Sequence, residues 1–142
     1  MAGIGFFIRI LEMRLWHEYL IAHLPRAQLL GQHRECAALR GAGWGRPHAT
    51  VNYVFEYPPR VLFEYHMKIM LEMEKRGYRP DAVWKNPRYR GKSVPPYAEA
   101  EMPDVAESAL PSPLYAEHNA AYLRECLVNL TGKGITLDWP AD

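Results

Sequence analysis

The stretch from Pro59 to Arg76, which has the periodicity of an α-helix, constrains the fold of this chain more than any other. Prolines at positions 58 and 59 suit the first turn of a helix, and Gly77 suits its left-handed cap. Residues that suit a core recur at the 3.6-residue period: Leu62, Tyr65, His66, Ile69, Met70 and Met73. Opposite charges stand four residues apart on the outer faces: Glu64 with Lys68, and Glu72 with Arg76. We therefore expect this helix to be the scaffold, with His66 as a packed residue.

Two further helices are predicted. One occupies residues 25–41, entered through Pro25 and ended by Gly41. The other runs from about Leu114 to Leu130, with Ser112 as its cap and Pro113 as its first residue. Its buried stripe is formed by small and apolar residues: Ala120, Leu123, Leu127 and Leu130. The fold class is therefore mainly α, a compact three-helix single domain with long irregular connections.

One connection has an ambiguous pattern. Val51, Tyr53 and Phe55 alternate as in a short strand, but the rest of the chain offers no clear partner strand. We therefore favour an extended connector between Trp44 and Tyr57. Residues 98–113 are acidic and contain proline, which is typical of a mobile connector.

The length of 142 residues suits one core. We expect a single helical domain over 13–142, because Met13 begins a stretch that reads like a second start. Residues 1–12 are then an N-terminal extension, either a poorly ordered arm or an upstream start that the working protein does not use. Cys36 and Cys126 are single and far apart, so neither a disulfide framework nor a zinc ribbon is indicated. We expect a reduced, cytoplasmic, nucleoid-associated protein.

Charge is distributed unevenly along the chain. Residues 26–92 contain 13 Lys and Arg against 6 Asp and Glu, whereas 93–142 contain 2 against 8. A basic half suggests a polyanionic partner, with nucleic acid first, although the acidic tail could fold over it. Between Tyr78 and Tyr97 basic residues alternate with aromatic ones, which suits contact with phosphates and unpaired bases but is also compatible with an ordinary long loop.

The helix over 25–41 carries the candidate chemistry. On its helical wheel Arg34 and Glu35 share one face with small residues, namely Ala27, Gly31 and Ala38. Such a face leaves room for a substrate, and it also fits a solvated surface with a chance Arg beside a Glu. A metal-dependent hydrolase is a weaker hypothesis, since the six histidines match no ligand spacing: His17, His23, His33, His48, His66 and His118. We expect no metal and no cofactor.

Several short motifs occur in a recognisable order. They are Gln28-Leu29-Leu30-Gly31-Gln32-His33-Arg34-Glu35, His48-Ala49-Thr50, Lys75-Arg76-Gly77-Tyr78 and Tyr89-Arg90-Gly91. This set resembles the pyrimidine dimer DNA glycosylases of the phage endonuclease V type, most clearly from Met13 to about Lys92. The resemblance implies a small all-helical enzyme that excises ultraviolet photodimers from double-stranded DNA and nicks the abasic strand. It implies no membrane and no obligate protein partner.

The resemblance also implies residue roles. In the family the α-amine of the mature N-terminus attacks the sugar, and a glutamate on the first helix assists. A terminal amine suits this task because its pKa near 8 leaves about a tenth of it deprotonated at neutral pH. Glu35 takes the glutamate role. The family spacing of about twenty residues places the amine at Arg14, directly after Met13, whereas a start at Met1 would place it a dozen residues away.

DNA contacts are expected mainly from basic and polar residues of the basic half: Arg34, Gln28, His33, Arg46, Arg88, Arg90 and Lys92. Arg34 would bind a phosphate beside the lesion. The alternative is a non-catalytic nucleic-acid-binding protein of the same fold, which would bind DNA regardless of Glu35.

Overall fold

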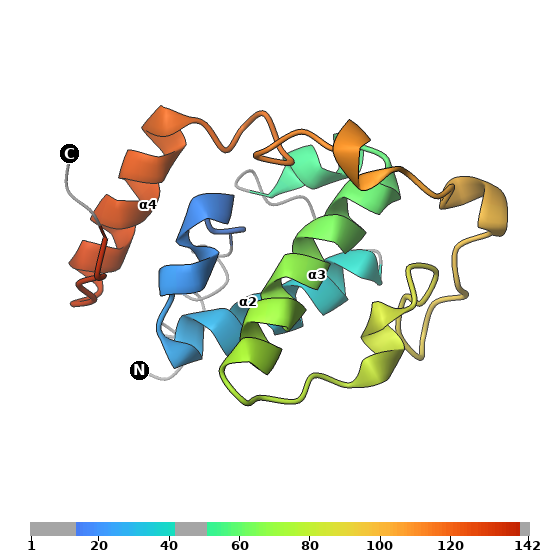
Figure 1. The fold of residues 1–142 in the computed structure, drawn as a ribbon, viewed down its shortest axis with the longest axis horizontal. Helices are drawn as coiled ribbons and strands as arrows, with labels where there is room; N and C mark the ends of the chain where they lie inside the picture. Colours follow the sequence, from blue (N-terminus) through green and yellow to red (C-terminus); the bar gives the residue numbers. More distant parts are fainter. Residues whose placement is uncertain (1–13, 42–50, 140–142) are drawn as a thin grey trace, which may run out of the picture.

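The computed structural model describes residues 14–41 and 51–139, and every regular element in those ranges is helical (Figure 1). These ranges contain three α-helices: α2 (Arg26–Arg40), α3 (Pro59–Lys75) and α4 (Ala120–Gly132). The same ranges contain five short 3₁₀ helices, of which η1 (Glu18–His23) precedes α2 and the others lie between the α-helices: η2 (Asn52–Glu56), η3 (Ala82–Lys85), η4 (Glu99–Glu101) and η5 (Glu107–Ala109). The mainly α, three-helix prediction is confirmed.

The α2 and α3 helices pack against each other and form the centre of the fold (Figure 1). All six residues of the predicted α3 stripe are buried, so the helical repeat identified the core correctly. From α2, Leu29, Cys36 and Leu39 enter the same core. As predicted, Gly77 adopts a positive φ of 90° directly after α3.

Charged side chains at the two ends of α3 form hydrogen bonds within the helix and to the segment before α2. Arg76 donates to Glu72 at 2.8 Å, as predicted, and also to the carbonyl of Leu24 at 2.6 Å. The Leu24 contact fixes the chain where it passes from η1 into α2. The predicted partner of Glu64 is different, since Glu64 accepts from Arg60 at 2.8 Å instead of pairing with Lys68.

The last helix begins later than predicted. Leu114 lies in the connecting segment, where its backbone N–H donates to the Glu18 carboxylate at 2.8 Å. Ser112 and Pro113 are therefore not its cap and first residue. The cap is Asn119, whose side-chain oxygen accepts from the backbone of Tyr122 at 2.9 Å. Among the residues of the predicted stripe, Leu130 is buried, Leu123 and Leu127 are half-buried, and Ala120 is exposed.

The prediction of an extended connector is wrong for Asn52–Glu56, because these residues form η2. Val51 and Val54 are buried at a spacing of three, the period of a 3₁₀ helix, whereas Phe55 is exposed. The alternation that suggested extended backbone therefore does not describe the buried face. The rest of the connector, 44–50, lies outside the described residues.

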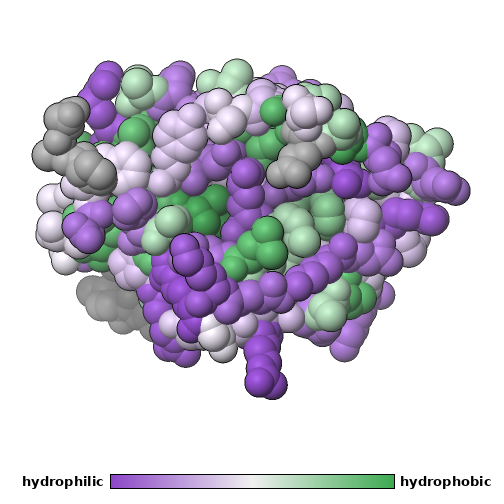
Figure 2. All heavy atoms as spheres, viewed as in Figure 1, coloured by the Kyte–Doolittle hydropathy of each residue, from purple (hydrophilic) through white to green (hydrophobic). Residues whose placement is uncertain are grey.

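Figure 2 shows hydrophilic side chains over most of one face and hydrophobic ones in separate patches. Among the residues that the structure describes, four large apolar side chains are exposed: Tyr19, Phe55, Leu71 and Val128. Within residues 14–41 and 51–139, no helix combines the length and the apolar character that crossing a membrane requires.

Candidate active site

The buried side chain of Gln32 on α2 joins the N-terminal segment to Glu35. Its Nε2 donates to the carbonyl of Arg14 at 3.0 Å and to Oε2 of Glu35 at 2.8 Å. Its Oε1 accepts from the backbone N–H of Trp16 at 2.6 Å. These partners fix which end of the amide is nitrogen, because the Trp16 N–H can only donate and the carboxylate and carbonyl accept. One side chain therefore holds both Arg14 and Glu35.

Glu35 has the ionisation behaviour of an acid–base group. Burial raises the pKa of its carboxyl from 4.5 to about 7, against the opposing effects of Arg34, the Gln32 hydrogen bond and Lys133. At neutral pH the carboxyl is therefore present in both protonation states. A group of this kind can accept a proton in one step and return it in another.

The segment 14–17 lies inside the protein although it has no regular secondary structure. Arg14, Leu15, Trp16 and His17 are all buried. The Arg14 guanidinium lies 4.0 Å from the carboxylate of Glu125 on α4. The chain therefore enters the described structure between α2 and α4, beside Glu35. Of the predicted catalytic residues, Arg14 and Glu35 both bond to Gln32 here, and Met13 lies outside the described residues.

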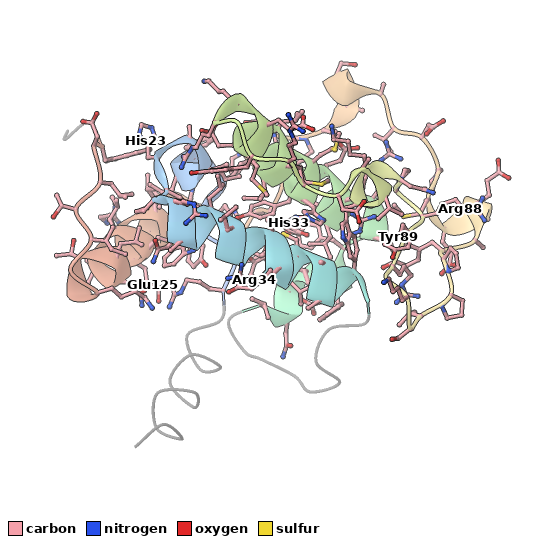
Figure 3. All side chains as sticks on the ribbon, turned by 90° about the horizontal axis from the view of Figure 1, so that it is seen from below. His23, His33, Arg34, Arg88, Tyr89 and Glu125 are labelled. Atoms are coloured by element: carbon pink, nitrogen blue, oxygen red, sulfur yellow. The ribbon has the colours of Figure 1, made fainter. Side chains whose placement is uncertain are left out.

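The predicted DNA contacts do not form one cluster. Arg34 is exposed and its guanidinium lies over Gly31, where an added Cβ would be 3.7 Å from the Nη2 atom. In Figure 3 Arg34 lies near the middle of the view, between Glu125 on the left and Tyr89 and Arg88 on the right. Gln28 is half-buried on the first turns of α2. Arg46 lies outside the described residues.

His33 belongs to a chain of hydrogen bonds that leads into the core. Its Nδ1 is 2.7 Å from Nε2 of His66, and Nδ1 of His66 is 3.0 Å from Nη1 of Arg40. Because a guanidinium can only donate, Nδ1 of His66 accepts, Nε2 of His66 donates, and the free proton of neutral His33 sits on Nε2. Burial, Arg40 and His33 lower the pKa of His66 to about 2. The sequence interpretation of His66 as a packed residue is confirmed.

Arg40 is a buried cation that organises the segment from Tyr78 to Tyr97, which follows α3 and is called the aromatic loop below. Its guanidinium donates to the carbonyls of Trp84, Asn86 and Tyr89 at 2.7 to 2.8 Å. It also lies 5.1 Å from the centre of the Trp84 ring. Burial lowers the pKa of Arg40 to about 10, so it remains charged at neutral pH.

The basic residues of this loop mostly bond to the protein itself. Arg88 donates to the Tyr97 carbonyl at 2.7 Å, and Arg90 donates to the Arg40 carbonyl at 2.8 Å. The Arg90 guanidinium also lies 4.2 Å from the Tyr97 ring. Lys92 is exposed. The loop is therefore a constrained surface, from which Arg88 and Lys92 remain exposed to a partner.

Sequence reasoning missed Gln32 and Arg40 as organising residues. Both fall at core positions of α2, in register with Leu29, Cys36 and Leu39. A polar residue at a predicted core position was the available signal, because a buried polar group needs partners. Among the described residues, no group of three or more His, Cys, Asp and Glu side chains could hold a metal ion.

Comparison with known families identifies the chain. Residues 13–86 match the family described as pyrimidine dimer DNA glycosylase. The chain belongs to this family. The matched residues of this glycosylase family member include all of α2 and α3, and with them Gln32, Glu35 and Arg40, whereas α4 follows the matched range. Comparisons with curated proteins and with solved structures found no match.

Proposed function

We propose that this family member is a DNA glycosylase with AP-lyase activity that acts on pyrimidine dimers in double-stranded DNA. The observation that carries the proposal is the single nitrogen of Gln32, which bonds both Glu35 and the backbone of Arg14. An amine-dependent reaction needs its nucleophile and its carboxyl group in one place. Family membership supports damaged DNA as the substrate.

The proposed chemistry uses an amine and a carboxyl group. The amine lone pair attacks C1′ of the damaged nucleotide, the glycosidic bond breaks and the base leaves with its electron pair. The sugar ring then opens to give an imine, and loss of a C2′ proton expels the 3′ phosphate. Glu35 serves as the group that passes protons to and from the sugar, since its pKa of about 7 suits both directions. Arg34 binds a phosphate beside the lesion.

We assign the amine to the neighbourhood of Met13 and Arg14. The family match begins at Met13. A chain that starts there carries its amine on Met13 or, after methionine removal, on Arg14, and the size of Arg14 disfavours that removal. Residues 1–12 are then an extension outside the working domain, which covers 13–142.

DNA binding is assigned to two surfaces. Around Glu35 the binding residues are Arg34 and Gln28. The second surface consists of His33, in the middle of α2 and bonded to His66 of α3, and the exposed loop residues Arg88 and Lys92, with Arg90 supporting the loop. Arg46 is retained as a contact from the basic half of the chain. The aromatic loop would support a bent duplex, which access to a sugar carbon requires.

Borohydride trapping tests the proposal. Chains that begin at Met1 and at Met13 are mixed with dimer-containing and undamaged duplexes, and borohydride reduces any imine to a stable covalent adduct. We expect an adduct only with damaged DNA, and mainly from the chain that begins at Met13. Mass spectrometry of the adduct identifies the residue that bears the amine. If both chains bind DNA and neither forms an adduct, the protein is instead a non-catalytic DNA-binding member of the family.

A further inference from the structure

The backbone of residues 14–18 is held largely by side chains. Besides the two Gln32 contacts, the Tyr65 hydroxyl donates to the carbonyl of Trp16 at 2.7 Å. The Tyr122 hydroxyl donates to the carbonyl of Leu15 at 2.6 Å. The backbone N–H of Glu18 donates to Nδ1 of His118 at 3.1 Å. Backbone groups of the segment are therefore held by side chains from α2, α3, α4 and the residue before the α4 cap.

Two of these contacts come from the C-terminal part of the chain. Tyr122 lies in the first turn of α4, and His118 lies directly before the Asn119 cap. Their rings stack, with centroids 5.3 Å apart and planes 21° from parallel. Nε2 of His118 is 2.8 Å from the Tyr53 hydroxyl, which fixes the imidazole from its other side.

The protonation state of His118 suits this role. Burial, and then the neighbouring His17, lower its pKa to about 3. The imidazole is therefore neutral at physiological pH. Its Nδ1 accepts from Glu18, so its Nε2 carries the proton and donates to Tyr53. The contact with the segment does not change over the pH range in which the enzyme would work.

We propose that Tyr122 and His118 are positioning residues that hold segment 14–18 so that the amine stays beside Glu35. This inference rests on the proposed function. A nucleophile at a chain end is mobile unless the residues behind it are fixed, and small displacements of a reacting group cost large factors in rate. Gln32 holds the segment from the α2 side, and Tyr122 with His118 holds it from the α4 side.

The inference extends the site beyond the part of the chain that the family match covers. That match ends at residue 86, before either residue. Residues 13–86 therefore contain the acid–base group and one side of the holding contacts, and the last part of the chain supplies the other side.

The test compares two tyrosine variants of the chain that begins at Met13. Tyr122→Phe removes the hydroxyl that bonds Leu15. Tyr57→Phe is the matched control, because the Tyr57 hydroxyl bonds Glu117 and the backbone of Ala116 in the same region without touching segment 14–18. Single-turnover adduct formation is measured at saturating damaged duplex, well below the unfolding temperature of each variant. Amide hydrogen exchange of residues 14–18 is measured on the same proteins without DNA.

We expect Tyr122→Phe to slow adduct formation about tenfold or more, to leave duplex affinity unchanged and to speed exchange of the Trp16 and Glu18 amides. Tyr57→Phe should match the wild type in all three. Wild-type rates of adduct formation and exchange in Tyr122→Phe would overturn the inference. If the wild type itself forms no adduct, the proposed function fails. Exchange then decides separately whether Tyr122 holds the segment.

A second pair of variants tests His118. Asn places a carbonyl oxygen where Nδ1 of His118 stands, whereas Leu removes the acceptor. We expect His118→Asn to restore much of the adduct rate that His118→Leu loses. Equal rates in the two variants would show that the hydrogen bond to Glu18 does not position the segment.

Discussion

Gln32 donates a hydrogen bond to the Glu35 carboxylate at 2.8 Å, and both residues lie on α2, three positions apart. The same nitrogen of Gln32 bonds the Arg14 carbonyl. The amide is 1% exposed, so neither contact can be replaced easily by water. A single helix turn thus couples the ionisable group of the site to the chain segment that would carry the nucleophile.

Glu35→Gln should abolish most turnover and preserve DNA binding. The amide keeps the size of the carboxyl but cannot transfer protons, and a positioned acid–base group typically contributes a factor of about 10² to 10⁴. Single-turnover cleavage of dimer-containing duplex measures the first effect and fluorescence anisotropy the second. Glu74→Gln on α3 is the control, and cleavage by Glu35→Gln at the rate of this control would exclude the assigned role.

The raised pKa of Glu35 should also be visible in stability. The folded protein keeps this proton up to about pH 7, whereas the unfolded chain loses it near pH 4.5. Folded molecules bind more protons between these values, so the free energy of unfolding should fall as pH rises through this window. Glu35→Gln lacks this dependence. Urea unfolding should find the variant more stable than the wild type by about 3 kcal/mol at pH 8, and nearly equal to it at pH 4.5.

Gln32→Leu should destabilise the fold by about 2 kcal/mol or more, because it leaves the buried carbonyl of Arg14 and the buried N–H of Trp16 without their partner. Its adduct formation should also be slow. Gln28→Leu, one turn earlier and only half-buried, should change the free energy of unfolding by about 0.5 kcal/mol or less. Equal unfolding midpoints in urea for the two variants would contradict this account.

Arg40→Met should cost about 3 kcal/mol, because three backbone carbonyls lose the donor that the buried guanidinium supplies. Arg34→Met, on the exposed face of the same helix, should be nearly neutral. Limited proteolysis should cut Arg40→Met faster than the wild type between Trp84 and Tyr89. Wild-type protection of this loop would show that Arg40 is not what fixes it.

Arg34→Ala should weaken DNA binding mainly through charge. Loss of one phosphate contact reduces the slope of log affinity against log salt by about 1. Binding titrations at several salt concentrations measure the slope, with Arg76→Ala as the comparison, since Arg76 is occupied by Glu72 and the carbonyl of Leu24. An unchanged slope for Arg34→Ala would remove Arg34 from the DNA interface.

The sequence predicted helices that rest on strong periodicity or clear ends. The α3 stripe and the end of α2 at Gly41 were found because apolar spacing and glycine caps are local signals. The start of α4 was predicted too early, because Ser112 and Pro113 match the pattern of a helix cap. The backbone of Leu114 instead donates to Glu18, which lies 96 residues earlier in the sequence. No local pattern encodes such a contact.

The candidate site likewise contains residues that a local pattern identifies and contacts that no local pattern identifies. Arg34 and Glu35 could be singled out from their shared face on α2. The hydrogen bonds that Gln32 and Tyr122 make to the N-terminal segment could not, because each joins residues distant in sequence. The sequence left two alternatives for the loop over 78–97, a surface that contacts nucleic acid and an ordinary long loop. Its Arg90 faces the protein, since aromatic and carbonyl partners within the fold satisfy the guanidinium.

The buried guanidinium of Arg40 affects how the loop after α3 would bind a DNA duplex. If the loop that contains Trp84 and Tyr89 moved away, it would strand a charge in the core, so this loop behaves as a rigid template. Adaptation must then come from the nucleic acid, whose bending energy depends on local stiffness. Damage that weakens base stacking lowers this energy. Such a rigid protein surface would favour damaged over intact duplex before any base is contacted.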